Sequence, residues 1–294
     1  MRNLFSVLAL LAAITSAATA QVLPSETPGF SHPESVCQTG QILFVSNMGA
    51  SLDPSGKDGD GFISRVDLST RRVTDLRFIS ALNSPKGMAL HGHTLYVADI
   101  DHILGFDIDT RKKVLDLPIP GTHFLNDLVI GDGRLYASGS DNGKVYDVDL
   151  QSHACRALPL SDSITGANGL CYDDSAHRLY CVGIGTWGSN DGKVFVIDPG
   201  TYAVTPISDY RGLLDGVDRI GNVLYFSDWK GMQDSKGVLV ALDLDTHKTS
   251  TLSFGRGTIA GPADFSLSAD RRYFIIPATM EGKVLYIPVR QRPS

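Results

Sequence analysis

The stretch Asn126-Asp-Leu-Val-Ile-Gly-Asp-Gly-Arg-Leu-Tyr-Ala-Ser-Gly-Ser-Asp-Asn-Gly-Lys-Val-Tyr-Asp-Val-Asp149 decides the fold. It holds three short apolar-rich runs, and the last of them alternates cleanly between polar and apolar residues. Turns rich in Gly, Asp and Asn separate the runs. Period-two patterning between such turns is typical of antiparallel strands. The stretch therefore predicts a small sheet whose consecutive strands are joined by tight turns.

This unit is used six times along the chain. Each copy opens with a short apolar strand that starts at or next to a polar residue, and a second, aromatic-rich run follows, as in Thr94-Leu-Tyr-Val97. The copies begin at Glu34, Lys86, Asn126, Asn168, Asp215 and the Ala263-Asp264 pair, which lie 40 to 52 residues apart. Units of this length with four strands each are the blades of a β-propeller, and amphipathic helical windows are absent. We therefore predict an all-β, six-bladed β-propeller domain over residues 21–294.

The last copy ends after its third strand, Lys283-Val-Leu-Tyr-Ile-Pro288. A blade that lacked its fourth strand would leave an exposed sheet edge, which folded proteins avoid. We expect residues 21–30 to supply the missing strand and to close the ring.

Residues 1–20 have the composition of a signal peptide. Arg2 gives a positive start, residues 4–14 form a short apolar stretch, and Ala18-Thr-Ala20 matches the small-residue cleavage pattern. The apolar stretch is too short to span a bilayer as a helix, and the alternative is an uncleaved anchor. We expect a secreted or periplasmic protein with no membrane insertion after cleavage.

The formal net charge is −6. A mildly acidic protein of this kind argues against nucleic acid or anionic membrane as the partner. We expect a monomer that acts on a small-molecule substrate.

Four cysteines follow the predicted signal peptide: Cys37, Cys155, Cys171 and Cys181. Their spacing contains no C-x-x-C metal or redox motif. An exported protein can form disulfides, and Cys171 and Cys181 flank a turn across which they could face each other. Buried free thiols on the strand faces are the alternative.

The innermost strand of each propeller blade lines the central channel, so the first residue of each copy is expected near the channel mouth. Glu34 and Asp215 bring two carboxylates there, and Asn126 and Asn168 bring two amides. Such oxygen ligands suit Ca²⁺, Mg²⁺ or Mn²⁺, and the two negative charges balance a divalent ion. His and Cys are missing from these positions, so a typical zinc site is not indicated. A water-filled channel without metal is the alternative.

The same residues carry a family resemblance, through Pro33-Glu34, Phe124-Leu-Asn126-Asp127, Gly166-Ala-Asn168-Gly169-Leu and Leu214-Asp215-Gly216. Over essentially all of residues 21–294 the chain resembles the senescence marker protein / gluconolactonase / luciferin-regenerating enzyme family and, more distantly, the paraoxonases. The resemblance implies that Glu34, Asn126, Asn168 and Asp215 hold one catalytic divalent cation. Ca²⁺ is the expected ion, with Mg²⁺, Mn²⁺ or Zn²⁺ as alternatives. The implied activity is metal-dependent hydrolysis of a lactone or related ester, with Asp215 as general base as well as ligand.

The chain departs from that family at two positions. Phe124 stands where its lactonases carry an arginine that contacts the sugar, and Ser35 stands where paraoxonases place an acid for a second calcium. A less polar substrate than a sugar lactone is therefore expected.

Two of the site residues are expected to contact substrate. Phe124 would line the pocket, and Lys86 occupies the axis position of the second blade. The lysine would either donate a hydrogen bond to a developing oxyanion or form an ion pair with Asp264 or Glu34.

A non-catalytic propeller that binds a ligand or a protein and keeps a structural metal is the alternative function, because the fold alone does not decide. A strictosidine-synthase-like activity is less favoured, since that branch lacks the metal-binding set retained here.

Overall fold

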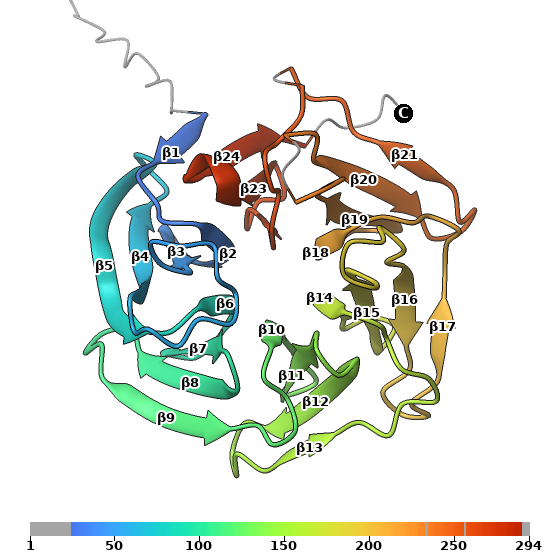
Figure 1. The fold of residues 1–294 in the computed structure, drawn as a ribbon, viewed down its shortest axis with the longest axis horizontal. Helices are drawn as coiled ribbons and strands as arrows, with labels where there is room; N and C mark the ends of the chain where they lie inside the picture. Colours follow the sequence, from blue (N-terminus) through green and yellow to red (C-terminus); the bar gives the residue numbers. More distant parts are fainter. Residues whose placement is uncertain (1–24, 233–234, 256, 290–294) are drawn as a thin grey trace, which may run out of the picture.

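The computed structural model describes residues 25–232, 235–255 and 257–289, and it contains six four-stranded antiparallel sheets set around a central axis (Figure 1). Blades one to three consist of β2 (Pro33–Thr39), β3 (Ile42–Asn47), β4 (Gly61–Asp67) and β5 (Arg72–Leu82); β6 (Pro85–His91), β7 (Thr94–Asp99), β8 (His102–Asp107) and β9 (Lys113–Pro118); and β10 (Leu125–Gly131), β11 (Arg134–Gly139), β12 (Lys144–Asp149) and β13 (Cys155–Ala157). Blades four and five consist of β14 (Ala167–Asp173), β15 (Arg178–Gly183), β16 (Val194–Ile197) and β17 (Val204–Pro206); and β18 (Leu214–Ile220), β19 (Val223–Asp228), β20 (Val238–Asp243) and β21 (Thr249–Thr251). Blade six joins β22 (Ser266–Leu267), β23 (Tyr273–Ala278) and β24 (Lys283–Pro288) to β1 (Glu26–Pro28), with one 3-10 turn, η1 (Thr279–Glu281), between β23 and β24. The predicted all-β, six-bladed propeller is confirmed.

The ring is closed by the N-terminal segment, as expected. Strand β1 pairs with β24, the third strand of blade six, through the register Thr27↔Val284. The Thr27 hydroxyl donates to the Arg71 carbonyl at 2.8 Å and lies 3.1 Å from the Tyr286 hydroxyl, so β1 also ties blade six to blade one. Residues 21–24 of the expected closing segment and the predicted signal peptide, 1–20, lie outside the described residues.

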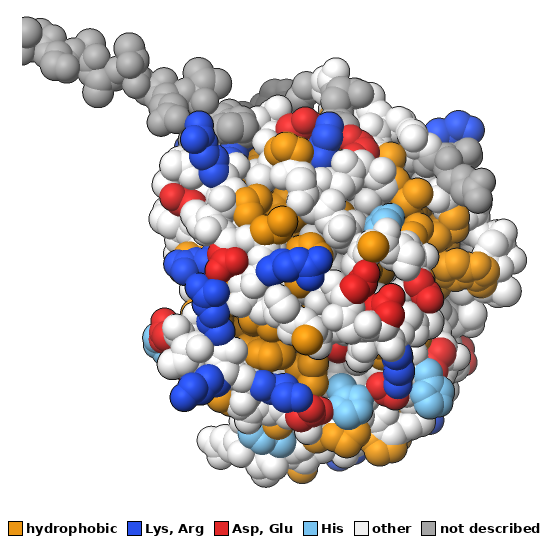
Figure 2. All heavy atoms as spheres, turned by 60° about the vertical axis from the view of Figure 1, so that its left-hand side comes forward, with side chains coloured by type: hydrophobic (Ala, Val, Ile, Leu, Met, Phe, Trp, Pro, Cys, Tyr) orange, Lys and Arg blue, Asp and Glu red, His pale blue; other side chains and the backbone are white. Residues whose placement is uncertain are grey.

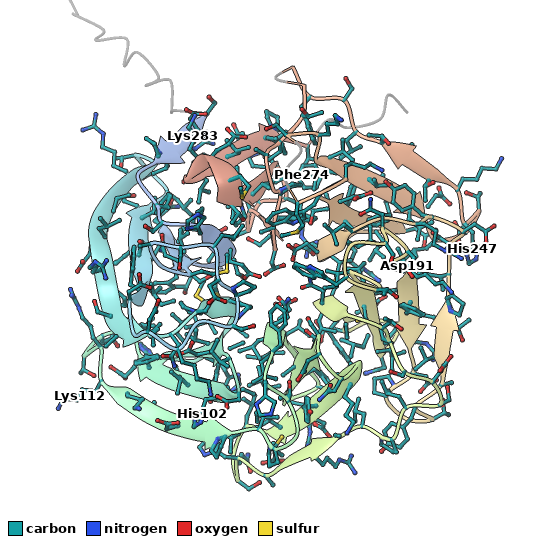
Figure 3. All side chains as sticks on the ribbon, in the orientation of Figure 1. His102, Lys112, Asp191, His247, Phe274 and Lys283 are labelled. Atoms are coloured by element: carbon teal, nitrogen blue, oxygen red, sulfur yellow. The ribbon has the colours of Figure 1, made fainter. Side chains whose placement is uncertain are left out.

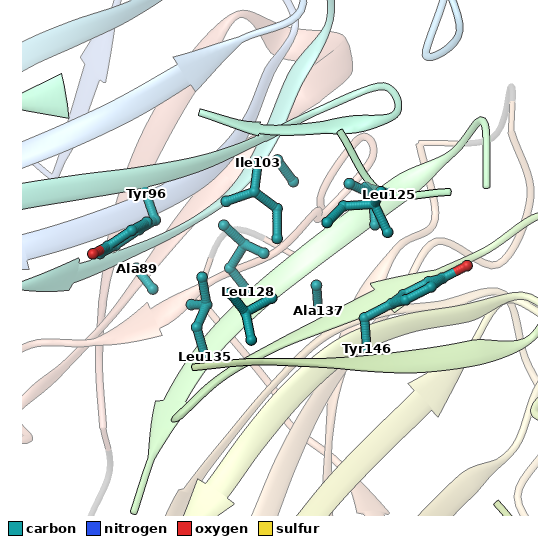
Figure 4. Packing of buried hydrophobic residues seen from close by; sticks show 11 residues of the cluster. Ala89, Tyr96, Ile103, Leu125, Leu128, Leu135, Ala137 and Tyr146 are labelled. Carbon is teal, nitrogen blue, oxygen red and sulfur yellow. The ribbon is translucent and has the colours of Figure 1, made fainter. Parts of the chain in front are cut away.

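Apolar side chains from neighbouring blades pack against each other between the sheets. Figure 4 shows the contact of blades two and three, where Tyr96 and Ile103 of one blade meet Leu125, Leu128 and Leu135 of the next. Because side chains alternate along a strand, each blade can supply apolar residues to the interfaces on both of its sides. Burying each large aliphatic side chain stabilises the fold by about 1.5–3 kcal/mol.

The cysteines are free thiols in this structure. Cys171 lies opposite Tyr180 in the ladder, whereas Cys181 lies opposite Leu170. The two thiols consequently belong to different apolar clusters, on opposite faces of blade four. A disulfide between them is not formed, and the alternative of buried free thiols is correct for this pair.

On the face of the molecule drawn in Figure 2, Lys and Arg side chains are interspersed with Asp and Glu. Within the described part of the chain, no helix is long and apolar enough to cross a membrane.

The inner strands share an irregularity that places the axis residues. Five of them, β2, β6, β10, β14 and β18, break register with their neighbours directly after their first residue. The second residue of each, at positions 34, 86, 126, 168 and 215, therefore stands in the irregular segment rather than in the regular ladder. Bulges of this kind re-aim a side chain. In this propeller they turn the predicted site residues toward one common pocket.

Candidate metal centre

The structure brings the four predicted metal ligands together, and they line one pocket. They belong to the inner strands β2, β10, β14 and β18, which surround the central axis (Figure 1). Glu34, Asn126, Asn168 and Asp215 come from blades one, three, four and five. Their exposed fractions are 6%, 4%, 3% and 7%, respectively. Four polar side chains that are this deeply buried need partners, because an unpaired buried polar group costs about 1–3 kcal/mol.

Each of the four side chains nevertheless has one buried oxygen without a hydrogen-bond partner. These atoms are Glu34 Oε2, Asn126 Oδ1, Asn168 Oδ1 and Asp215 Oδ1. Only two other such side-chain atoms occur in the described residues, the hydroxyls of Ser84 and Ser266. Four unpaired oxygens from four blades would supply part of the roughly six to eight oxygen ligands that a hard cation such as Ca²⁺ takes, and water or substrate would supply the rest. The residues present therefore fit such an ion.

Hydrogen bonds behind the two amides fix their orientation. Asn126 Nδ2 donates to the Ser140 hydroxyl at 3.2 Å, and Asn168 Nδ2 donates to the Leu214 carbonyl at 3.4 Å. With each amide nitrogen used in this way, the amide oxygen is the atom left for the pocket. Outer partners of this kind orient ligands in metal sites generally.

Asp215 is held by an indole. Trp229 Nε1 donates to Asp215 Oδ2 at 2.7 Å, which leaves Oδ1 unpaired. Trp229 and Ser140 are not recognisable as site residues from the sequence. Both residues follow the second strand of their blade, where the repeat pattern gives no signal for a contact with the inner strand.

The two carboxylates disfavour each other's charge when no cation is present. Burial, followed by the charge of Asp215, raises the pKa of Glu34 well above its ordinary value. Burial raises the pKa of Asp215 to about 7, against the opposing effect of the hydrogen bond from Trp229 and of the nearby Asn168 amide. A divalent cation between them would remove this repulsion.

Two further acids line the channel but are hydrogen-bonded within it. Asp127 accepts from the backbone N–H groups of Leu128 and Leu170, both at 2.6 Å, and so links β10 to β14. Asp264 accepts from the Ser35 hydroxyl at 2.5 Å. Among the described residues, no group of three or more His, Cys, Asp or Glu side chains is placed to hold a metal. The candidate centre therefore depends on two carboxylates together with two amides.

Lys86 and Phe124 lie side by side at the pocket, but the lysine does not make the ion pair that the sequence suggested. The Lys86 ammonium donates to the Ser84 carbonyl at 2.9 Å and lies 4.9 Å from the centroid of the Phe124 ring. In the described structure it is not ion-paired with Glu34 or Asp264. Burial lowers the pKa of Lys86 to about 8, although the charges of Glu34 and Asp99 act to raise it.

Glu34, Lys86, Asn126, Asn168 and Asp215 form the polar part of the pocket lining, called the pocket floor, and the remaining walls are apolar. The pocket has a volume of about 130 Å³. Its apolar lining includes Met48, Leu52, Phe124, Ile184, Trp187, Leu213, Trp229 and Met232. Trp187 is 60% exposed and belongs to the glycine-rich loop 183–192. A cavity of about 150 Å³ holds a benzene ring, so the pocket is sized for one small ring or a short chain.

The inner strands β14 and β18 lie so close to each other that a methyl group added at Gly169 would push them apart. A Cβ on Gly169 would lie 2.2 Å from the Asp215 carbonyl oxygen. We expect Gly169→Ala to displace Asn168 and Asp215, to destabilise the fold by about 1–3 kcal/mol, and to remove the stabilisation by Ca²⁺. Thermal unfolding with and without Ca²⁺ measures both effects. The control is Gly255→Ala, whose added Cβ meets nothing within 4 Å; equal behaviour of the two variants would contradict the close packing.

Neither a family model nor a curated protein sequence matches this chain. Among solved structures, a chain of a nidogen/laminin complex is 22% identical with a TM-score of 0.60, covering 77% of this chain and 81% of that one. Kuenenia stuttgartiensis hydrazine synthase is 16% identical with a TM-score of 0.58, covering 91% and 77%. The computationally designed Ika8 protein is 13% identical with a TM-score of 0.52, covering 87% and 71%. At these identities the likeness establishes the fold alone, and the chain is a six-bladed β-propeller.

Proposed function

We propose that this propeller is a divalent-cation-dependent hydrolase that opens a lactone or related ester at the mouth of its central channel. The proposal is carried by the four buried, unpaired oxygens of Glu34, Asn126, Asn168 and Asp215. The resemblance of their motifs to the senescence marker protein / gluconolactonase family supports the same function. All four donors are hard oxygens, which suit Ca²⁺, Mg²⁺ or Mn²⁺, and Ca²⁺ is the cation proposed among these.

A bound divalent cation would supply Lewis-acid polarisation of a carbonyl oxygen and of a water molecule. Asp215 supplies the base as well as a ligand: Trp229 holds its Oδ2, and the carboxylate, which belongs to the pocket lining, takes a proton from the attacking water. The carboxyl then returns a proton to the leaving oxygen as the acyl carbon–oxygen bond breaks. The apolar walls keep bulk water away from these atoms, which strengthens the electrostatic interactions inside the pocket.

The substrate is expected to be small and to carry few hydroxyl groups. A phenyl ring at position 124 cannot donate the several hydrogen bonds that a guanidinium gives to sugar oxygens. We therefore predict that an aliphatic six-membered-ring lactone or a phenyl ester is hydrolysed with a higher kcat/KM than gluconolactone. Parallel initial-rate measurements on the three substrates check this, and a clear preference for gluconolactone would show that another residue recognises the sugar.

The function itself is tested by a hydrolysis screen over lactones and aryl esters. We expect turnover in Ca²⁺, loss of turnover when the protein is freed of cation, and recovery when Ca²⁺ is returned. Asn168→Ala should require a higher Ca²⁺ concentration for the same rate, because it removes one ligand. If Ca²⁺, Mg²⁺, Mn²⁺ and Zn²⁺ all fail to support hydrolysis while one of them raises the melting temperature, the propeller is a binding protein with a structural metal.

A further inference from the structure

We propose that the Lys86 ammonium is the anion-binding group of the axial pocket. It would hydrogen-bond the oxygen that becomes negative when the carbonyl is attacked, and afterwards the carboxylate of the product. This inference rests on the proposed hydrolase function and names the chemical class that the site releases: a small carboxylate, which is a hydroxycarboxylate when the substrate is a lactone.

Lys86 is held rigidly from behind. The Asp99 carboxylate accepts from the backbone N–H groups of Asn83 and Ser84 at 2.9–3.2 Å. These bonds hold the chain directly before the Ser84 carbonyl, which accepts from the ammonium. The next residue, Gly87, packs so tightly that a Cβ there would lie 2.4 Å from the Asp127 Cα. The backbone on both sides of Lys86 is therefore pinned, and the ammonium is preorganised rather than mobile.

The ammonium retains donors for a ligand. It has three N–H groups, of which one is used by the Ser84 carbonyl. No second hydrogen-bond acceptor for it occurs in the described residues, and the Phe124 ring shields it at 4.9 Å. Lys86 lines the same pocket as the four oxygen ligands and is 1% exposed. A desolvated donor that faces a pocket interacts strongly with an anion, because water does not compete for it.

The charges of the pocket floor add up to an anion site. Of the charged side chains that line the pocket itself, Glu34 and Asp215 contribute −2 and Lys86 +1, so a bound divalent cation would bring their sum to +1. Asp127 and Asp264 are not part of this lining and are hydrogen-bonded elsewhere in the channel. An uncharged ester enters this field, and both the tetrahedral oxyanion and the product carboxylate neutralise it. A lysine with a purely structural role is harder to explain, since burying a charge costs several kcal/mol and an apolar side chain of similar volume would pack there without that cost.

The step balances without a further reactant. Water adds its oxygen to the acyl carbon, the acyl carbon–oxygen bond breaks, and one proton of the water goes to the leaving alkoxide. The second proton leaves the carboxylic acid for solvent and gives the carboxylate that Lys86 retains. Lys86 donates hydrogen bonds throughout and keeps its own protons.

The first test replaces Lys86 by methionine, which preserves chain length and removes the charge. We expect Lys86→Met to lower kcat about 100-fold, the scale for loss of one oxyanion donor. The variant should bind Ca²⁺ as tightly as the native protein or more tightly, because a nearby positive charge has gone. A lysine that only supported the fold would instead give weaker Ca²⁺ binding and a lower melting temperature. Lys112→Met, on the outer rim in Figure 3, is the matched control and should change neither quantity.

The second test measures the binding of a carboxylate that is not hydrolysed. By calorimetry in Ca²⁺, benzoate should bind native protein at least about tenfold more tightly than benzamide, the equivalent of one full hydrogen bond. Lys86→Met should reduce this ratio several-fold, and Lys86→Gln serves if the methionine variant does not fold. A native ratio near one, or a ratio unchanged in the variants, overturns the proposal. If native protein hydrolyses no lactone or ester, the proposed function fails, yet the benzoate ratio still decides the role of Lys86.

Discussion

Replacing Asp215 by alanine is expected to lower hydrolysis by at least about 10³-fold, since it removes a general base, which alone contributes about 10²–10⁴, together with a cation ligand. Asp215 Oδ1 is one of the four unpaired oxygens, and Trp229 holds the other carboxylate oxygen. The same variant should lack the rise in melting temperature that we expect Ca²⁺ to give the native protein. Initial rates and thermal unfolding in a Ca²⁺ titration measure the two effects.

The matched control is Asp264→Asn. Asp264 is as buried as Asp215, but its Oδ2 accepts a hydrogen bond from the Ser35 hydroxyl, and neither of its oxygens is among the fully buried unpaired atoms of the described residues. This variant should keep its response to Ca²⁺. If Asp264→Asn loses the response and Asp215→Ala retains it, the cation binds deeper in the channel than the four unpaired oxygens indicate.

The blades were predictable because the strands of each blade, apart from β1 in blade six, are consecutive in the sequence. Consecutive strands such as β10 and β11 are joined by turns of a few residues, so alternation and Gly-rich turns reveal them one unit at a time. Ring closure by β1 was predictable for a different reason: the last unit lacked a strand, and a free edge is disfavoured. The axis residues followed from the phase of the repeat.

Contacts that cross strands or blades could not be read in the same way. The cysteine pair shows why: Cys171 lies opposite Tyr180, and a register difference of one residue puts Cys181 on the other face of the sheet. Sequence spacing does not fix register to one residue.

Lys86 is a second case. Its actual neighbours, the Ser84 carbonyl and the Phe124 ring, depend on a backbone turn and on an adjacent blade. The charges of Glu34 and Asp264 were visible in the sequence and suggested an ion pair. The distances that ruled out that ion pair were not visible.

Removing the cation is expected to destabilise the protein, and by more at high pH than at low pH. A ligand that binds only the folded state stabilises it by about 2.7 kcal/mol at 100 times its dissociation constant, or roughly 5–10 °C in melting temperature for a domain of this size. At lower pH, protons compete with the cation for the carboxylates of Glu34 and Asp215, so its affinity falls.

Without a cation, the contribution of the Glu34 and Asp215 carboxyl groups to the free energy of unfolding should instead fall as the pH rises. Burial raises the pKa of Asp215 to about 7, above the ordinary value of about 4 that the unfolded chain has. The folded state then binds more protons than the unfolded state across this window. The resulting stability is complete below about pH 4 and is lost as the pH rises through about 7. The raised pKa of Glu34 acts in the same direction.

The difference between the melting temperatures with Ca²⁺ and without cation should therefore widen steadily from pH 5 to pH 8. Subtracting one curve from the other cancels titrating groups away from the axis, which contribute equally to both. Asn168→Ala, which removes an uncharged ligand, should reduce the difference at every pH and preserve its upward slope. A difference that is zero, or constant over this range, would show that Glu34 and Asp215 do not hold the ion.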